Sequence, residues 1–306
     1  MSDPKNIIEA KPFIKWAGGK SQLLYEIRRY YPFDEKINKY CEPFVGAGAV
    51  LFDVLNNYDL KEVYISDINK ETINSYKVIR DEVENLIDLL EEFQNEYKDL
   101  TYEERKVIYY RNREEFNRLK VLKNSASLER AALFIFLNKT GFNGLYRENL
   151  SGGFNVPIGA YKNPKILDRD NLLKVNKKLQ NVEIIHGDYK KSDDFIDKNT
   201  FVYFDPPYRP IKSTSNFTSY SKGSFNDENQ IELAEFFKKM DQKSAHLLLS
   251  NSDPKNHDSE DDFFDDLYKE FNIERVKASR TINSNKKKRG LINEVLINNY
   301  GKNRQI

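Results

Sequence analysis

The sequence has few of the residues that build disulfides and metal sites. Among its 306 residues there is one cysteine, Cys41, and there are three histidines, His186, His246 and His257. One cysteine excludes an intrachain disulfide, and the histidines are too widely separated for the short ligand spacings of a zinc site. We therefore expect no metal centre. Cys41 is expected to be a small buried apolar residue within a strand rather than a nucleophile.

Long apolar runs and an excess of charge are also missing. No apolar stretch approaches the ~20 residues of a membrane span, and the polar segment 1–6 lacks a signal-peptide core. These absences predict a cytoplasmic protein that makes no membrane contact. The 49 basic and 48 acidic residues leave a net charge of +1. Overall charge therefore gives no reason to expect a nucleic-acid ligand, and such a ligand has to be argued from local groups.

The most informative stretch runs from Phe201 to Tyr208 and reads FVYFDPPY. Its first four residues are typical of a buried parallel strand. Two prolines end the strand, because proline has no N–H to donate to the ladder. Asp205 and Tyr208 are thus predicted to emerge at the carboxyl end of a strand, where open α/β sheets bind ligands.

These residues suit the alkylation of an aromatic amine. The exocyclic amino group of adenine is a weak nucleophile because its lone pair is delocalised into the ring. The Asp205 carboxylate and the backbone carbonyl of Pro206 would accept both amino hydrogens, and Tyr208 would stack on the base. From the motif alone, an ordinary strand end whose aspartate caps a neighbouring segment stays open.

A glycine turn near the N-terminus predicts a zwitterionic ligand. The segment 15–21, KWAGGKS, ends like a phosphate-binding loop but has Ile14 where such a loop needs a glycine. Its two glycines instead allow a tight turn that brings Trp16 and Lys20 to one ligand. S-adenosylmethionine suits both, because Lys20 would bind its carboxylate and Trp16 would line the pocket for its methionyl part.

A second glycine turn, with Gly46 and Gly48, lies between a predicted strand at 39–42 and a predicted helix at 49–55. By itself it fits a ligand-binding turn and a plain strand-to-helix connection equally well. Asp67 ends the next predicted strand and follows Gly48 by 19 residues. This is close to the ~20-residue spacing at which an acid binds ribose hydroxyls, so we predict that Asp67 binds the ribose of the cofactor.

The remaining pattern predicts an α/β protein with an insertion. Apolar residues recur at helical spacing between about 75 and 138, and the glycine-rich stretch 138–161 predicts a hairpin around 151–153. Further elements are predicted at 182–185 (strand), 229–239 (helix), 245–250 (strand), and 273–278 with 293–298 (an antiparallel pair). We therefore expect a Rossmann-like sheet of about seven strands built from 1–74 and 169–306. Residues 75–168 would form an inserted recognition domain of helices and a hairpin.

Three motifs together resemble one family. The Asp205-Pro206-Pro207-Tyr208 motif, the segment 42–48 (EPFVGAG) and the segment 12–20 (PFIKWAGGK) occur in the order found in the Dam-type DNA adenine methyltransferases, which are GATC-specific and of class alpha. Family-like stretches extend from about Lys11 to Tyr300. The resemblance implies methyl transfer from S-adenosylmethionine to the 6-amino group of adenine in double-stranded DNA containing GATC. It further implies base flipping and direct attack, with neither a metal nor a covalent enzyme intermediate.

The resemblance also implies roles for individual residues. The catalytic set would be Asp205, Pro206, Pro207 and Tyr208. The cofactor set would be Trp16, Lys20, Glu42, Phe44, Gly46, Gly48, Asp67, Asp188 and Asp205. In the DNA-binding set, Phe142 would insert into the duplex, Asn143 would contact a phosphate, Lys15 would contact the first guanine, and Leu145, Arg147, Pro157 and Tyr161 would read bases. Phe142 stands where the family often has tyrosine, which keeps the stacking face and loses a hydroxyl.

Several alternatives stay open. Asp188 is either an acid near the cofactor adenine or a simple turn aspartate, and the 138–161 hairpin either reads bases or packs on the helices as a solvated loop. Residues 213–221 are either a loop that closes on the extruded base or a long connection, and the basic run 286–289 either grips phosphates or stays mobile. Two other functions fit the residues: methylation of an amine on RNA or protein, and DNA binding without catalysis. The sequence leaves open whether a partner restriction endonuclease exists.

Overall fold

A computed structural model describes most of the chain as two compact units. The described residues are 9–16, 18–122, 127–209, 225–279 and 291–301. The first unit comprises Met1–Gly19, Gly46–Asn57 and Asn69–His186, and the second comprises Lys20–Val45, Tyr58–Ile68 and Gly187–Ile306. The predictions for 213–221 and 286–289 lie outside the described residues. The division into 1–74 with 169–306 and an insertion at 75–168 stays a prediction.

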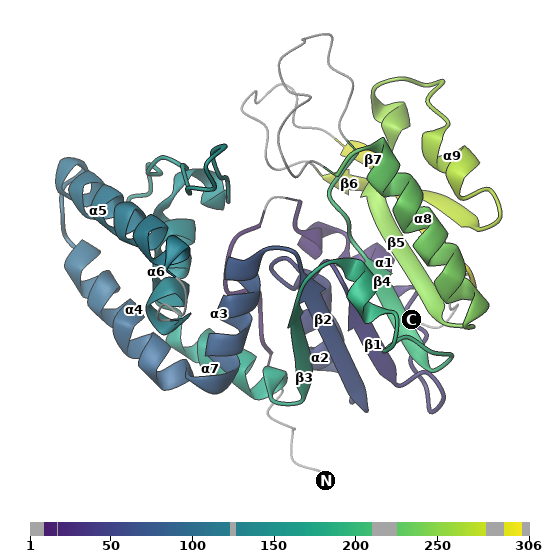
Figure 1. The fold of residues 1–306 in the computed structure, drawn as a ribbon, viewed down its shortest axis with the longest axis horizontal. Helices are drawn as coiled ribbons and strands as arrows, with labels where there is room; N and C mark the ends of the chain where they lie inside the picture. The colour runs from purple at the N-terminus through teal and green to yellow at the C-terminus, as the bar shows by residue number, and fades with distance from the viewer. Residues whose placement is uncertain (1–8, 17, 123–126, 210–224, 280–290, 302–306) are drawn as a thin grey trace. The chain divides into compact units, whose positions relative to one another are not determined.

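The described strands form a seven-stranded sheet in the order β3-β2-β1-β4-β5-β7-β6 (Figure 1). The six strands of the second unit are β1 (Lys39–Glu42), β2 (Glu62–Asp67), β4 (Thr200–Phe204), β5 (His246–Ser252), β6 (Asn272–Ser279) and β7 (Leu291–Asn298). Strands β2, β1, β4 and β5 are parallel, whereas β7 is antiparallel to both β5 and β6. The predicted Rossmann-like sheet with an antiparallel C-terminal pair is confirmed.

The core of the second unit lies around its central strand β4. Every residue of β4 is buried, and the neighbouring strand β5 is buried over Leu247–Leu249. Such continuous apolar strands are typical of a parallel sheet that is covered on both faces. Cys41 in β1 is fully buried, as predicted. The helical elements of this unit are η1 (Lys20–Gln22), α1 (Leu24–Arg28), η3 (Tyr189–Ser192), α8 (Asp227–Gln242), η4 (Pro254–Asn256) and α9 (Phe263–Leu267).

The first unit is mainly helical. Its elements are α2 (Ala49–Asn57), α3 (Lys70–Asp81), α4 (Val83–Tyr97), α5 (Tyr102–Val121), α6 (Ser127–Thr140), η2 (Phe142–Gly144), α7 (Arg169–Leu179) and the strand β3 (Val182–His186). Helix α6 contacts α3, α4 and α5, and its residues from Arg130 to Asn138 are all buried. The predicted apolar stripe of α4 is confirmed, because Leu86, Ile87 and Leu90 are fully buried.

Polar side chains fix where the helices of the first unit begin and how they join. Asn69 caps α3 by accepting hydrogen bonds from the next turn, and Thr101 and Glu104 form a capping box at the start of α5. Glu71 of α3 and Arg130 of α6 form a buried ion pair with a distance of 2.9 Å. Within the described ranges, no helix has both the length and the apolar content of a membrane span.

The segment 141–161, which follows α6, reverses direction near Ser151–Gly153 as predicted. Asn149 N–H donates to Gly153 O over 2.9 Å, and Asn155 N–H donates to Arg147 O over 3.0 Å. The pairing consists of the isolated bridges Gly141↔Ile158 and Glu148↔Phe154 rather than two continuous strands. Glycines and prolines in this stretch limit ladder formation, because glycine adds backbone entropy and proline removes a donor.

Candidate active site

A buried cluster of charged groups surrounds Lys20 in the second unit. The Lys20 side chain is 3% exposed, and its Nζ lies 2.9 Å from Asp205 Oδ1 and 3.4 Å from Glu294 Oε2. Nζ also donates to the Tyr208 hydroxyl over 2.9 Å, and the Tyr208 hydroxyl donates to Glu294 Oε1 over 2.8 Å. Three distant segments thus meet here: η1, the end of β4, and β7.

The end of β4 presents Asp205 as the sequence predicts. The strand stops at Phe204, the Asp205 side chain is 22% exposed, and Ser250 of β5 donates to Asp205 Oδ1 over 3.3 Å. The Ser250 hydroxyl also lies 2.7 Å from the Tyr203 hydroxyl. Since Ser250 has one O–H, Tyr203 is the donor when Ser250 donates to Asp205.

The prolines after Asp205 are held from α8. The Gln230 side chain donates to Pro207 O over 3.1 Å, which fixes the turn that follows the strand. Pro206 is buried and Pro207 is exposed. Sequence reasoning missed Gln230, because nothing in the local pattern of α8 marks a glutamine whose partner is 23 residues away.

The electrostatics of the cluster follow from one ammonium facing two carboxylates. Burial alone would lower the pKa of Lys20, but Asp205, Glu294 and Tyr208 raise it above its usual value, so Lys20 is charged. Burial raises the pKa of Asp205, Lys20 opposes this shift, and the Glu294 charge adds to it. Burial likewise raises the pKa of Tyr208. Tyr208 therefore keeps its hydroxyl proton and donates a hydrogen bond to Glu294.

The structure brings together two residues for which the sequence predicts separate roles. Lys20 was predicted to bind the cofactor carboxylate and Asp205 to accept from the substrate amine, and here they form an ion pair. Glu294 was missed by sequence reasoning. The available signal was the one charged residue in the strand LINEVLIN, because a charge within a buried strand needs a partner.

Other residues proposed for the cofactor lie at strand ends of the second unit. Glu42 ends β1, is 2% exposed and accepts from the Tyr40 hydroxyl over 2.7 Å. Phe44 stacks on Tyr189 with ring centroids 5.4 Å apart. Asp67 ends β2, and its backbone carbonyl accepts from Gly187 N–H over 3.0 Å. These placements leave the cofactor roles of Glu42, Phe44 and Asp67 as proposals.

Asp188 is engaged in a local cap. Its Oδ1 accepts a hydrogen bond from Lys190 N–H over 2.9 Å at the start of η3, and the residue is exposed. This is the geometry of the turn aspartate that the sequence left open. The second carboxylate oxygen leaves a cofactor role for Asp188 compatible with the cap.

The first unit holds the remaining cofactor candidates, Trp16 and the glycine turn. Gly46 and Gly48 have φ values of +47° and +75°, which favour glycine. A Cβ on Gly46 would lie 2.9 Å from Trp16 Nε1, and one on Gly48 would clash with the Tyr76 hydroxyl. The turn therefore requires glycine at both positions, and the Trp16 indole lies directly against it.

The DNA-binding candidates all belong to the first unit. The Lys15 ammonium lies 3.8 Å from the centroid of the Tyr161 ring. Asn138 of α6 holds the backbone around Lys15: its Oδ1 accepts from Lys15 N–H over 2.7 Å, and its Nδ2 donates to Lys15 O and Gly144 O over 2.8 and 2.9 Å. Lys15 and Tyr161, both predicted to face DNA bases, are thus in contact with one another.

The other DNA-binding candidates lie on the surface of the 141–161 segment. Phe142 is 50% exposed despite being a large apolar residue, and Asn143 beside it has a left-handed backbone with φ of 54°. Arg147 is exposed and donates to Asn155 Oδ1 over 2.7 Å and to Asn155 O over 3.2 Å. Leu145 and Pro157 are half-buried and exposed, respectively.

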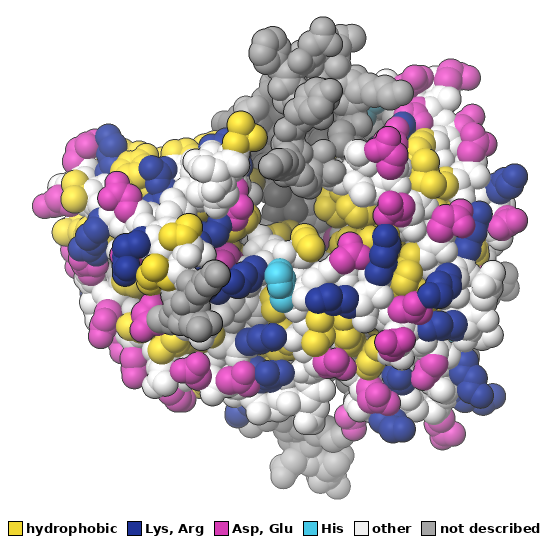
Figure 2. All heavy atoms as spheres, in the orientation of Figure 1, with side chains coloured by type: hydrophobic (Ala, Val, Ile, Leu, Met, Phe, Trp, Pro, Cys, Tyr) yellow, Lys and Arg dark blue, Asp and Glu magenta, His cyan; other side chains and the backbone are white. Residues whose placement is uncertain are grey.

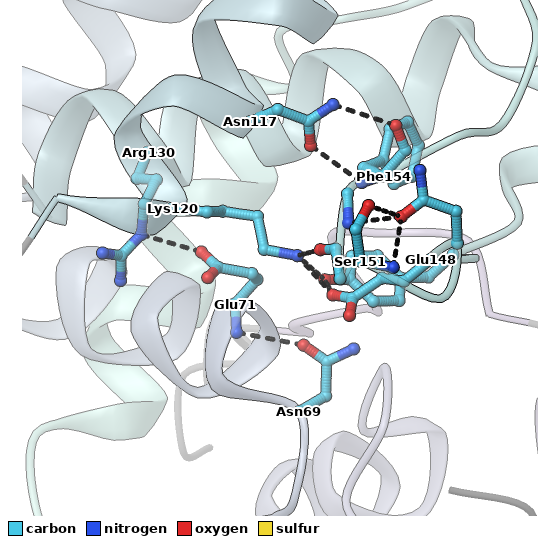
Figure 3. Close-up of polar contacts among 12 residues, drawn as sticks. Asn69, Glu71, Asn117, Lys120, Arg130, Glu148, Ser151 and Phe154 are labelled. Atoms are coloured by element: carbon cyan, nitrogen blue, oxygen red, sulfur yellow. Dashed lines mark hydrogen bonds and ion pairs between the residues drawn. The ribbon is translucent and has the colours of Figure 1, made fainter. Parts of the chain in front are cut away.

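Side chains of helix α5 hold the 141–161 segment through hydrogen bonds and an ion pair, as Figure 3 shows. Asn117 makes two hydrogen bonds with the backbone of Phe154, one to its carbonyl over 3.0 Å and one from its N–H over 2.7 Å. Lys120 pairs with Glu148 and donates to Gly152 O over 2.9 Å. Sequence reasoning missed Asn117 and Lys120, whose side chains give the segment a fixed attachment.

The surface carries charges of both signs. On the face in Figure 2, lysine and arginine side chains are interspersed with aspartate and glutamate, as the near-zero net charge predicts.

Among the residues that the structure describes, no group of three or more His, Cys, Asp or Glu side chains is arranged to hold a metal ion.

Comparison with known proteins gives consistent matches over nearly the whole chain. A family model for the D12 class N6 adenine-specific DNA methyltransferases matches residues 16–282. The chain is 50% identical over 298 residues to the type II methyltransferase M.MjaIII of Methanocaldococcus jannaschii, covering 96% of this chain and 100% of that protein. It is 38% identical to the type II methyltransferase M1.LlaDCHI of Lactococcus lactis subsp. cremoris, covering 97% and 98%. It is 35% identical to the DNA adenine methylase of Escherichia coli K12, covering 94% of each.

Proposed function

Because the chain belongs to the family of D12 class N6 adenine-specific DNA methyltransferases, we propose that it methylates the 6-amino group of adenine within GATC in double-stranded DNA. The observation that carries the proposal is the Lys20, Asp205 and Tyr208 cluster at the carboxyl end of β4. A carboxylate and an aromatic ring at this place are what activation and stacking of an extruded adenine require.

The donor set suits S-adenosylmethionine. Lys20 and Trp16 would hold its methionyl part, Asp67 its ribose, and Asp188 its adenine, and the glycines of the 46–48 turn would let the backbone approach it. When bound, S-adenosylmethionine would supply the methyl group: an N–C bond would form as the S–C bond breaks, the electron pair of that bond would stay on sulfur, and the methylated amino group would release one proton to solvent.

The chain's own groups orient and activate the amine. The ionised Asp205 accepts one amino hydrogen and the Pro206 carbonyl accepts the other, which localises the nitrogen lone pair. Tyr208 stacks on the base and holds its plane, while the buried surroundings strengthen each of these contacts. Lys20 lowers the pKa of Asp205 and so opposes the effect of burial, which favours the carboxylate form that accepts the amino hydrogen.

The 141–161 segment is the proposed reader of the DNA sequence. Its exposed Phe142 would enter a base stack, and the guanidinium group of Arg147 would read a guanine edge. The hydrogen bonds from Asn117 and Lys120 to the backbone of this segment support the proposal, because a segment that reads DNA bases must be held in one conformation. Two relatives are named type II methyltransferases, and a partner restriction endonuclease is part of the proposal for that reason.

The test is transfer of tritium from labelled S-adenosylmethionine to matched acceptors. The acceptors are a duplex with GATC, the same duplex with its adenine replaced, and an RNA duplex of the same sequence. We expect label in the first alone, and no label from folded Asp205→Ala, in which the amine loses its acceptor. Label in both DNA duplexes would reject GATC, label in RNA would support the other acceptor class, and near-normal transfer by Asp205→Ala would refute the mechanism.

A further inference from the structure

Glu294 is a buried acid that the proposed reaction leaves unexplained. It lies on β7, opposite Ser252 of β5 and Val276 of β6, and is 5% exposed. Its neighbours Val295 and Leu296 are fully buried. A carboxylate in such surroundings is costly unless it is paired, so its partners indicate its role.

Both partners of Glu294 belong to the methyl-transfer site. Its Oε1 accepts the Tyr208 hydroxyl over 2.8 Å, and its Oε2 lies 3.4 Å from Lys20 Nζ. Within the described residues, no group donates a hydrogen bond to Oε2. Glu294 therefore fixes the hydroxyl end of the ring that is to stack on the base, and it offers Lys20 a second carboxylate beside Asp205.

We propose that Glu294 is a positioning residue for methyl transfer: it orients Tyr208 and shares the Lys20 ammonium with Asp205, so that Asp205 keeps the capacity to accept from the substrate amine. This inference rests on the function proposed above. Lys20 carries one positive charge and faces two negative ones, which leaves one negative charge in excess. That excess favours the positive charge that develops on the amino nitrogen as it is methylated.

The chain offers a matched control for this arrangement. Glu274 on β6 accepts the Tyr30 hydroxyl over 2.6 Å, which is the same kind of carboxylate–tyrosine contact, made with a tyrosine that has no role in the proposed reaction. Glu294→Gln and Glu274→Gln remove one charge each and keep the shape of the side chain. A purely structural role predicts similar effects of the two changes.

The first measurement is the single-turnover rate with saturating DNA and cofactor. We expect Glu294→Gln to lower the rate about 10- to 100-fold through misplacement of Tyr208 and Asp205, and Glu274→Gln to change it by less than about twofold. Tyr208→Phe, which keeps the ring and removes the hydroxyl, should also slow the reaction. Combined with Glu294→Gln it should cost less than the product of the two single effects, because both break one contact.

The second measurement is the pH dependence of that rate, which a structural role would not move. Lys20 from η1 and Ser250 from β5 contact Asp205, and Glu294 from β7, Tyr203 and Tyr208 interact with it electrostatically. The Glu294 charge raises the pKa of Asp205, so Glu294→Gln should move the acid limb of the profile to lower pH.

The outcomes separate the inference from the function on which it rests. If the wild-type chain transfers methyl groups to DNA but Glu294→Gln matches Glu274→Gln in rate and in acid limb, the inference is wrong and the function stands. If the wild-type chain transfers none, the proposed function fails and the inference falls with it. Should Glu294→Gln not fold, Tyr208→Phe decides, and a wild-type rate for that variant overturns the inference.

Discussion

Replacing Gly46 by alanine probes the contact between the glycine turn and Trp16. At Gly46 the backbone is left-handed, which costs a residue with a Cβ ~1–2 kcal/mol. The new Cβ would also lie 2.9 Å from Trp16 Nε1 and 3.0 Å from its Cδ1, so the indole has to move, at an overpacking cost of ~1–3 kcal/mol. We expect the free energy of unfolding to fall by about 2–5 kcal/mol in total.

Gly152→Ala separates these two costs. Gly152 has a φ of +81°, but the nearest atom to its added Cβ lies 3.9 Å away, so this variant carries the backbone cost alone. Urea unfolding should therefore show that Gly46→Ala is less stable than Gly152→Ala by ~1–3 kcal/mol. Equal losses of stability would mean that Trp16 does not press on the turn.

Cofactor binding can be followed in the same variants, because Trp16 is the one tryptophan of the chain. Its fluorescence, titrated with S-adenosylmethionine, reports directly on the proposed pocket. We expect Gly152→Ala to bind like the wild type. Gly46→Ala should bind at least ~10-fold more weakly, a loss of ~1.4 kcal/mol, because the indole is displaced. Wild-type affinity and an unchanged spectrum for Gly46→Ala would refute the placement of Trp16 in the cofactor pocket.

Three further substitutions test the site, the reading of DNA and the fold. Lys20→Met removes the charge that lowers the pKa of Asp205, so the rate, which needs the carboxylate, should fall off at a higher pH than in the wild type; an acid limb that stays in place would contradict this. Arg147→Ala should relax discrimination at one base pair by ~1–3 kcal/mol in competition between duplexes, and unchanged selectivity would remove Arg147 from the readout. Arg130→Ala leaves Glu71 buried without its ion-pair partner and should lower the free energy of unfolding by ~3–5 kcal/mol in urea titrations, whereas a loss below ~1 kcal/mol would show that the pair is dispensable.

Much of the fold follows from patterns within short stretches. The strand before Asp205, the apolar stripe of α4 and the antiparallel C-terminal strands lie where the sequence predicts them. The division into compact units does not follow in this way, because each unit is assembled from three separate stretches of chain. The 141–161 segment is intermediate, since its reversal is local but its attachment through Asn117 is not.

The sequence by itself determined the chemistry that one strand end offers. Pro206, two residues after the end of the strand at Phe204, has no N–H to donate to the ladder, and the turn at Gly46 and Gly48 needs backbone angles that other residues resist. Both are local steric facts that can be read from the order of residues. Only the tertiary structure decided which charges meet. Lys20 and Asp205 are 185 residues apart, and Glu294 reaches them from β7 because an antiparallel strand pairs there with β5. Contacts between charged side chains so far apart in the sequence depend on the order of the strands in the sheet, and no short stretch of sequence contains that order.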